Sequence, residues 1–528
     1  MAHAAGGPIA WPAFDLEIPT TSPAAVAVPH AATWTTLARE NRAALNAVTT
    51  EIGGMPLAEL RRTARAEALP LAVAYTRGLG VAAPSGTADL LLGTGHQPLL
   101  VHPGIWVKYL VLARLVPPGQ VGLNLIVDSD AVDEVTAEVP YHDGQWRRAR
   151  VPLARGGPST PIEVIPAPRA HEWRQFVETV DRHLATVADG AMTAGWVRAR
   201  QFIPPASEHG LAGALSSLRR SLEGPRPYLD LPVSHLVRTP AFRRFAFAIL
   251  RDAGRFAVIH NACLDAYREH YGVRTSAQPF PDLDIDDHRI ETPFWYVAGG
   301  QRWPLFVEPL GRRLMAGDRD VGPVPDDPEE ASFADAPIRP RALTLTAFAR
   351  VVLTDLFIHG IGGGRYDRAT DAVVRAFFGI APPAYATATA TLFLPFEADS
   401  TIDAERQRLH RLLLDLQHNP DRFLGADGAH RALVEEKWAL IRRLEQGDHL
   451  TRRERRAATQ RIRELNTILQ VEVADKVVAA QRSLARLDRR QADTEVTAYR
   501  GYPFLFHRVE AVDALVDLLL DMSPERGA

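Results

Sequence analysis

Two histidines and one lysine lie close together in the segment GTGHQPLLVHPGIWVK, residues 93–108. The loop between the flanking apolar runs is longer than most strand-to-helix connections. Glycine allows close backbone approach, and the free amides at a helix start attract anions. We therefore predict that Gly95, His96, Gln97, His102 and Lys108 bind a phosphate or carboxylate group. The alternatives are a structural turn at the helix start and, for Lys108, an ordinary surface lysine.

Two carboxylates, Asp128 and Asp130, end the next apolar run, VGLNLIVDSD at 121–130. Carboxylates at the end of a strand can hold magnesium, take up a proton or bind an amine. The competing interpretation is that Asp130 and Asp133 form a helix start. The sequence does not match the common nucleotide-binding motifs. GTGHQP lacks the third glycine of the dinucleotide fingerprint, and a Walker A lysine motif is absent.

A glycine-rich segment, HGIGGGRYD at 359–367, is the next candidate. The helical pattern of 343–358 before it predicts a helix-to-helix connection that ends at a helix N-terminus. Gly363 and Tyr366 are its candidate substrate-binding residues. A glycine loop of this kind serves as a binding loop or as a tight structural turn, and both interpretations stay open.

Arginines crowd the start of a long helical pattern near the C-terminus. Arg452, Arg453 and Arg456 stand where the positive end of the helix dipole disfavours cations. We predict that they bind phosphate, with a solvated helix face as the alternative.

The segments that contain the first candidate residues are predicted to form a βαβ unit. A short apolar run at 90–93 predicts a buried strand, 105–116 a helix, and 121–130 a second strand. Parallel strands joined in this way carry ligands at their carboxyl ends. We therefore expect His96 and Asp130 to be neighbours at one sheet edge, which makes the fold α/β.

The remaining chain predicts further segments around this core. The pattern FWYVAGGQRWPLFVE at 294–308 is a hairpin candidate, and ATATATLFLP at 386–395 predicts a return to the sheet. The predicted divisions are an extended N-terminal arm at 1–33, a first core part at 34–140, inserted helical and β segments at 141–337, a second core part at 338–400, a helical arm at 401–498 and a C-terminal segment at 499–528 that returns to the core.

The helical arm contains a pattern without interruption from Thr451 to about Val496. Apolar residues recur there at steps of three and four, and Thr451 with Glu454 forms a capping box. About 46 residues at about 1.5 Å each give a rod of about 70 Å. We expect a long antiparallel coiled coil.

Composition sets the broad class. The 528 residues exceed one core, and 60 basic against 63 acidic residues give a net charge of −3, so we expect neither nucleic acid nor a membrane as a partner. The single cysteine, Cys263, excludes an internal disulfide and multi-cysteine metal sites, and it fits a reducing compartment. We predict a cytoplasmic protein without a required metal.

The order of several short motifs resembles one known family. The chain contains Gly95-His96-Gln97-Pro98, then Pro103 and Lys108, Asp130 after an apolar strand, Ile338-Arg339-Pro340, the glycine loop with Tyr366, and YPFLFH at 502–507. This order is similar to that of the bacillithiol-biosynthesis cysteine-adding enzymes, whose corresponding turn is Gly-Gln-Gln-Pro. Two differences fall in the presumed pocket: His96 replaces the first glutamine, and the family's acidic-histidine cluster is shortened to Asp128-Ser129-Asp130.

The resemblance implies a Rossmann-like core with inserted segments, a coiled coil, and a ligase that joins cysteine to an amino-sugar malate conjugate. It also implies ATP or ADP bound near the coiled coil, where Arg452, Arg453 and Arg456 are the candidates. We predict His96 and Asp130 as catalytic residues that act on a small-molecule substrate, in a possible homodimer. The alternatives are a nucleotidyl or phosphoryl transferase and a non-catalytic nucleotide-sensing scaffold with a partner-binding coiled coil.

Overall fold

The structure is a computed structural model that describes residues 16–187, 190–204, 207–273, 281–310, 312–330, 336–396, 402–424, 430–446 and 450–521. The first 15 residues of the predicted N-terminal arm and residues 522–528 of the predicted C-terminal segment lie outside this part. The chain divides into two compact units. The main unit comprises residues 1–141, 148–395 and 500–528, and the helical unit comprises residues 142–147 and 396–499.

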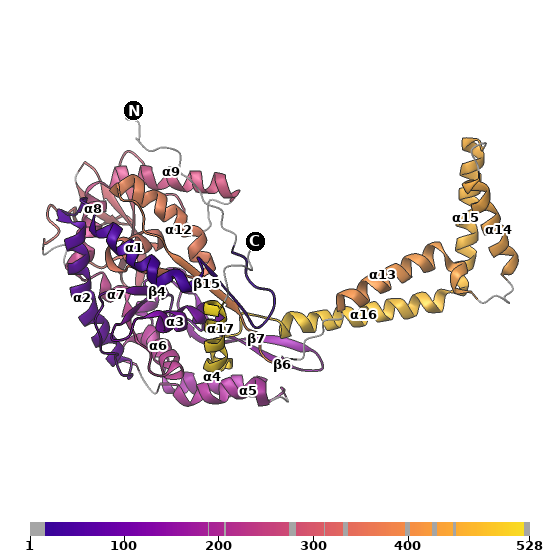
Figure 1. The fold of residues 1–528 in the computed structure, drawn as a ribbon, viewed down its shortest axis with the longest axis horizontal. Coiled ribbons are helices and arrows are strands. Elements are labelled where there is room, and N and C mark those ends of the chain that lie inside the picture. Colours follow the sequence, from indigo (N-terminus) through magenta and orange to yellow (C-terminus); the bar gives the residue numbers. More distant parts are fainter. Residues whose placement is uncertain are drawn as a thin grey trace. The chain divides into compact units, whose positions relative to one another are not determined.

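A six-stranded sheet forms the centre of the main unit, in the order β1-β15-β14-β4-β5-β8 (Figure 1). Its strands are β1 (Ala24–Val28), β4 (Leu92–His96), β5 (Gly122–Ile126), β8 (Tyr228–Pro232), β14 (Leu356–His359) and β15 (Ala386–Thr391). The five strands from β15 to β8 are parallel, and β1 pairs antiparallel with β15 at the edge. The α/β class and the parallel βαβ unit are therefore confirmed.

Helices cover both faces of this sheet. On one face lie α3 (Pro103–Leu115), α6 (Gly210–Glu223) and α17 (Val509–Asp521), of which α17 packs on α3 and β1. The other face is covered by helices that include α1 (Trp34–Asn46), α2 (Leu57–Gly78), α8 (Pro240–Arg251), α9 (Ala253–Tyr271) and α12 (Ile361–Val373). Apolar residues of β5, β8 and β14 pack with those of α2 and α8 in the main core.

The strand order reverses between β4 and β14. The chain leaves β4 through α3 and moves to β5 on one side, and it leaves β14 through α12 and moves to β15 on the other. Connections that diverge in this way open a crevice beyond the carboxyl ends of the two strands, and ligands of open α/β sheets bind there. The topology thus points to the ends of β4 and β14.

The predicted helix over 343–358 is wrong in its second half. The chain forms α11 (Ala342–Ala347), a π-helical segment η4 (Phe348–Leu353) and then strand β14. Residues 343–358 are apolar and buried almost throughout, so periodicity could not separate a buried helix from a buried strand. As a consequence, the glycine-rich segment follows a strand and opens α12, as residues 97–102 follow β4 and lead into α3.

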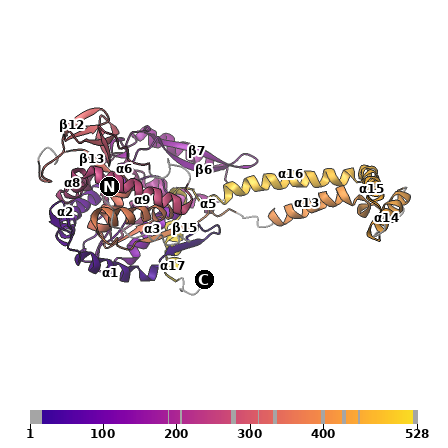
Figure 2. The same cartoon turned by 90° about the horizontal axis from the view of Figure 1, so that it is seen from above.

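A second, smaller sheet has the order β12-β11-β10-β9-β13, and β12 and β13 are labelled in Figure 2. Its strands are β9 (Ile290–Ala298), β10 (Gln301–Glu308), β11 (Arg313–Ala316), β12 (Arg319–Pro323) and β13 (Ile338–Pro340). The predicted hairpin around Gly299 and Gly300 is confirmed as β9 and β10. One strand of the main sheet, β8, comes from the stretch predicted as inserted, because its short apolar run stands among helices.

Two hairpins and further short helices complete the main unit. The hairpins are β2 (Glu51–Ile52) with β3 (Met55–Pro56), and β6 (Glu134–His142) with β7 (Trp146–Arg155), whose turn at 142–147 is assigned to the helical unit. The remaining helices are α4 (Ala170–Leu184), α5 (Gly190–Ala199) and α7 (Val233–Leu236).

The helical unit contains four main helices rather than one long rod. They are α13 (Ile402–His418), α14 (Arg431–Glu445), α15 (Arg452–Glu472) and α16 (Ala474–Thr497). Helix α13 packs on α16, and α14 packs on α15. The ion pairs Arg406–Asp488 and Arg461–Glu436 belong to these two antiparallel pairs.

The predicted uninterrupted helix over 451–496 is wrong, because it breaks at Val473. Val473 is buried and leaves the helical conformation at φ −107° and ψ 9°. Near the break, Asn466 and Gln470 donate hydrogen bonds to the last carbonyls of α13, His418 O and Gln417 O. The two halves of the pattern therefore pack on different partners, and two shorter helix pairs stand where we expected one long coiled coil.

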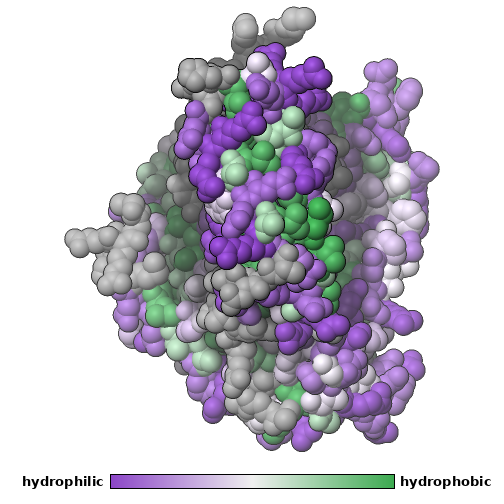
Figure 3. Space-filling model, turned by 90° about the vertical axis from the view of Figure 1, so that its right-hand side faces the viewer, coloured by the Kyte–Doolittle hydropathy of each residue, from purple (hydrophilic) through white to green (hydrophobic). Residues whose placement is uncertain are grey.

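Hydrophilic residues cover most of the face shown in Figure 3, with small hydrophobic areas between them. In the helical unit the exposed apolar side chains include Leu414, Ile468 and Val471. Within the described ranges, every helix is too short or too polar to cross a membrane.

The packing of α15 yields a matched pair of variants. Leu469 is fully buried, whereas its neighbour Ile468 is 46% exposed. Leu469→Asp should lower the free energy of unfolding by about 3 kcal/mol or more, because it buries a charge in the helix contact. Ile468→Asp should change it by less than about 0.5 kcal/mol. Urea unfolding followed by circular dichroism at 222 nm measures both, and equal losses would contradict the helix pairing.

Candidate functional site

The ammonium of Lys108 lies at the reversal point of the main sheet. Lys108 stands in the first turns of α3 and is 1% exposed, so it is not a surface lysine. Its Nζ donates a hydrogen bond to the carbonyl of Gly95 in β4 at 2.9 Å. Burial lowers the pKa of Lys108 to about 7. The side chain can thus switch between charged and neutral forms near neutral pH.

The backbone at the ends of β4 and β14 lies close to this lysine. A Cβ on Gly360, at the end of β14, would lie 3.9 Å from the Cδ and Cε of Lys108. A Cβ on Gly95 would lie 3.0 Å from the carbonyl oxygen of Leu125 in the neighbouring strand. The two strand ends therefore approach the lysine closely from both sides of the reversal point.

The two predicted histidines have separate positions. His96 ends β4, and its Nδ1 lies 3.1 Å from the carbonyl of Gln97. Burial, with a smaller contribution from Lys108, lowers its pKa to about 3. His102 is the N-cap of α3, where its Nδ1 accepts a hydrogen bond from the amide of Gly104 at 3.0 Å. Burial, followed by the charge of Arg500, lowers the pKa of His102 to about 4.

Both histidines are therefore neutral at pH 7. His96 can accept a proton, whereas one nitrogen of His102 already caps a helix. The α3 start, where we predicted an anion, thus has its first free amide satisfied by His102.

The start of α12 is uncapped by contrast. Gly360 is its N-cap and offers no side chain to the first amides. Gly362 and Gly363 are exposed, and a Cβ on Gly362 would meet nothing within 4 Å. The free amides of α12 begin beside the Lys108 side chain, at the point where the topology predicts a ligand. This segment is a better anion site than the start of α3.

His359, the last residue of β14, is held in place from α12. Its Nε2 lies 2.9 Å from Oδ2 of Asp367, which also pairs with the buried guanidinium of Arg350. A Cβ on Gly363 would lie 2.9 Å from Nδ1 of His359, so glycine is needed there for close packing. Tyr366, predicted as a substrate-binding residue, packs against Tyr267 of α9 at a ring distance of 6.5 Å.

The end of β5 brings a buried carboxylate to the same sheet edge. Asp128 is 3% exposed and accepts hydrogen bonds from the amide and the hydroxyl of Ser234, at 3.0 and 2.5 Å. Burial, with a smaller contribution from Glu163, raises its pKa to about 7. The alternative of a helix start at Asp130 and Asp133 is wrong, because the chain continues into strand β6.

Asp130 connects three elements. Its Oδ2 accepts a hydrogen bond from Nε2 of Gln97 at 2.8 Å, and its Oδ1 lies 3.4 Å from Nη1 of Arg302 in β10. The side chain of Asp130 stays 38% exposed. The predicted proximity of the two loops is thus supported by the contact between Gln97 and Asp130.

The second sheet supplies residues that sequence reasoning missed. Arg302 and Arg341 stack on the two-ring system of Trp295, at 4.5 and 4.0 Å from the ring centroid. Arg339 forms a two-pronged ion pair with Glu163, with both distances at 2.8 Å. Arg339 belongs to the motif used for the family resemblance, but the sequence offered no signal that places Arg302 beside Asp130.

The three arginines predicted to bind phosphate belong to the helical unit. Arg452, Arg453 and Arg456 are exposed at the start of α15. The helix start is already capped by Thr451 and by Glu454, whose carboxylate accepts the Thr451 amide at 2.9 Å. A phosphate group would meet this carboxylate, so the residues at this helix end do not by themselves fit a nucleotide.

Known proteins give no further guide to these residues. Neither a protein-family model nor a curated protein matches the chain. Within the described ranges, no three histidine, cysteine or acidic side chains converge as metal ligands.

The buried lysine makes a prediction about stability and pH. The pKa of Lys108 is about 7 in the folded chain and 10.5 ordinarily. Between these values the unfolded chain binds more protons, so the free energy of unfolding should rise with pH. In Lys108→Met this rise should be smaller by on the order of 4 kcal/mol between pH 7 and 10. Urea unfolding across this range measures the difference.

Lys476→Met is the matched control, because Lys476 is an exposed lysine of the helical unit. Its pH profile should run parallel to that of the wild type. A Lys108→Met profile that also runs parallel would contradict a pKa near 7.

Proposed function

We propose that this protein is a ligase-type enzyme that forms a C–N bond to a small, anionic polar metabolite at the carboxyl edge of the main sheet. The observation that carries the proposal is the buried Lys108 ammonium, which lies at the reversal point of the sheet next to the uncapped start of α12. Among the described residues Lys108 has one hydrogen-bond acceptor, a carbonyl, and an anion would compensate a buried cation of this kind. The amides of α12 add to this attraction.

The carboxylates supply the complementary chemistry for an amine. Asp130 is partly exposed and is held by Gln97 and Arg302, so it can bind an ammonium group or take up its proton. His96 is the second candidate residue, and because its pKa is lowered to about 3, it suits hydrogen bonding to the substrate in its neutral form. An anion near Lys108 and an amine near Asp130 would then occupy the ends of the adjacent strands β4 and β5.

The resemblance stated above narrows the substrates within this proposal. It favours cysteine as the amine and an amino-sugar malate conjugate as the anionic partner, on a Rossmann-like core in the cytoplasm. ATP or ADP belongs to the same proposal, and it would supply the driving force for condensation.

A ligand-stabilisation screen tests the proposal directly. Specific ligands raise the melting temperature by mass action, and a ligand at a hundred times its Kd adds about 2.7 kcal/mol to the stability. The screen contains cysteine, amino-sugar malate conjugates, ATP and ADP. Stabilisation by ATP alone would favour a nucleotide-sensing scaffold. If none of the four kinds of compound stabilises the protein, the proposed substrates are excluded.

Turnover of the substrates found in the screen gives the next prediction. His96→Ala and Asp130→Asn should each reduce turnover about a hundredfold or more, the usual scale for loss of a general acid or base. Circular dichroism should show that both variants keep their helix content.

Asp133→Asn is the matched control, since Asp133 is exposed three residues after Asp130. It should keep wild-type turnover. Full turnover in both His96→Ala and Asp130→Asn would show that the proposed residues do not act on the substrate.

The phosphate hypothesis for the helical unit has its own test. Replacing Arg452, Arg453 and Arg456 by glutamine should weaken ATP binding and flatten its salt dependence if these arginines contact phosphate. Isothermal titration calorimetry at two salt concentrations measures both effects. The control replaces three other exposed arginines of the unit, Arg463, Arg482 and Arg486. Equal affinity in the two triple variants would assign the patch to a solvated helix face.

A further inference from the structure

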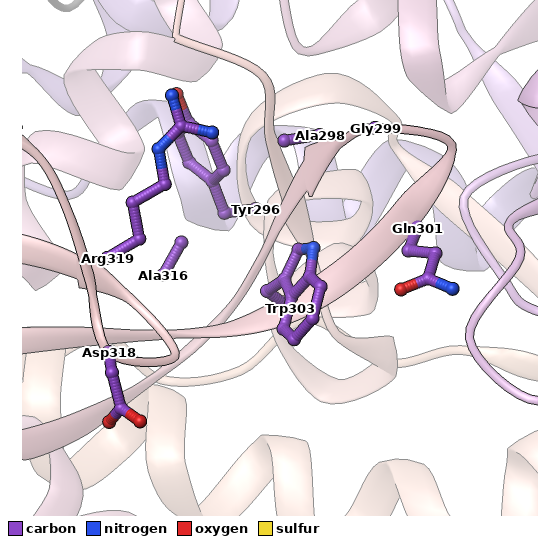
Figure 4. A pocket seen from close by; sticks show the side chains of 8 residues that line it. All are labelled: Tyr296, Ala298, Gly299, Gln301, Trp303, Ala316, Asp318 and Arg319. Carbon is purple, nitrogen blue, oxygen red and sulfur yellow. The ribbon is translucent and has the colours of Figure 1, made fainter.

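A cavity lies on the small sheet, formed by the β9–β10 hairpin and the turn between β11 and β12 (Figure 4). It encloses about 510 Å³, within the range of about 300–1,000 Å³ that small-molecule sites occupy. The side chains used below to argue its ligand are those of Tyr296, Gln301, Trp303, Asp318 and Arg319.

Strand alternation separates this cavity from the candidate site. Tyr296 pairs with Trp303 across the hairpin, so both side chains project from the same face of the sheet. Trp295 and Arg302, each one residue away from these two, project from the opposite face, where Arg302 reaches Asp130. The two sites therefore share strands β9 and β10 and use opposite faces.

The cavity has an aromatic floor. Trp303 is 43% exposed, which is unusual for the largest apolar side chain unless it meets a partner. Tyr296 is the second aromatic residue of the lining, and in Figure 4 its ring lies behind the guanidinium of Arg319. A Cβ on Gly317 would lie 3.5 Å from Cε3 of Trp303, so the β11–β12 turn closes against the edge of the indole.

Polar groups surround this floor without using their hydrogen-bonding capacity. Within the described part of the chain, no hydrogen bond is made by the side chains of Tyr296, Gln301, Trp303 or Arg319. Asp318 makes one ion pair, at 3.3 Å with Arg289, and its side chain remains fully exposed. The rim thus offers an amide, a guanidinium, a phenol, an indole N–H and a carboxylate.

The charges decide the class of ligand. Asp318 and Arg319 cancel, so the lining carries no net charge, and a nucleotide phosphate would meet the carboxylate. A sugar ring has apolar C–H faces that stack on aromatic rings, and hydroxyls that exchange hydrogen bonds with amide, guanidinium and carboxylate groups. We propose that this cavity binds a neutral saccharide of one or two rings, stacked on Trp303 and held by Gln301, Asp318 and Arg319.

Direct binding to the full chain tests this proposal. The probes are methyl glucoside, methyl N-acetylglucosaminide, cellobiose and chitobiose, with AMP as the nucleotide comparison. At least one saccharide should give a saturable change in tryptophan fluorescence and a saturable heat in calorimetry. Trp303→Ala and Gln301→Ala should each weaken the calorimetric affinity by about tenfold or more. Gln301 is exposed, so its replacement tests the site even if the tryptophan variant folds poorly.

Two controls separate this site from others. Trp438→Phe changes another exposed tryptophan, in α14 of the helical unit, and should leave saccharide binding unchanged. Asp130→Asn should also leave it unchanged, so failure of the proposed ligase activity does not affect this result. The proposal is overturned if no saccharide binds, if AMP binds more tightly than every saccharide, or if binding survives both Trp303→Ala and Gln301→Ala.

Discussion

The burial of one ammonium group governs the arrangement at the carboxyl edge of the main sheet. Helix α3 is largely apolar, and Lys108 is its buried cation. Within the described residues its Nζ donates one hydrogen bond, to the carbonyl of Gly95 in β4, and Gly360 at the end of β14 lies beside its side chain. The neighbouring histidines, His96 and His359, have lowered pKa values chiefly because they are buried, so they add little positive charge to the site at neutral pH. The main charge that can change near neutral pH at the reversal point is therefore that of Lys108.

A second buried charge cluster, under α3 and α6, shows what full compensation looks like. Arg219 pairs with Glu223 and Asp230 at 2.8 and 2.9 Å, and Arg220 lies 3.3 Å from Asp230. Trp106 and Asn124 donate further hydrogen bonds to the two carboxylates, at 2.7 Å each. Two cations face two anions there, so the charges of the cluster balance, and the cluster joins α6, α3, β5 and β8. Within the described residues Lys108 has no such anionic partner, and the proposal that it binds an anionic ligand rests on this difference.

The sequence predicted the arrangement of residues 93–130 well and the arrangement around the end of β14 poorly. The βαβ pattern around residues 93–130 carried its own periodicity, so the meeting of Gln97 and Asp130 followed from parallel topology. The end of β14 was missed because residues 343–358 are mostly apolar and buried almost throughout, and helix and strand look alike in a buried run. Arg302 reaches Asp130 through a hairpin more than 170 residues away in the chain, and one sequence contains no signal for such a contact. The helix break at Val473 was not predicted, because the apolar spacing continues from α15 into α16. The two helices nevertheless pack on different partners.

The two carboxylates that follow β5 differ in burial and in hydrogen-bond partners, so they suit different chemical roles. Asp128 and Asp130 are two residues apart, but Asp128 is enclosed and bound by Ser234, whereas Asp130 is open to solvent and approached by Arg302. Burial raises the pKa of Asp128 to about 7, so it can hold a proton at neutral pH as Lys108 can release one. Opposed shifts of this kind let one sheet edge donate and accept protons at the same pH. A reaction that joins an amine to an anionic metabolite needs both capacities within reach of one substrate pair, and the ends of β4 and β5 provide them on adjacent strands.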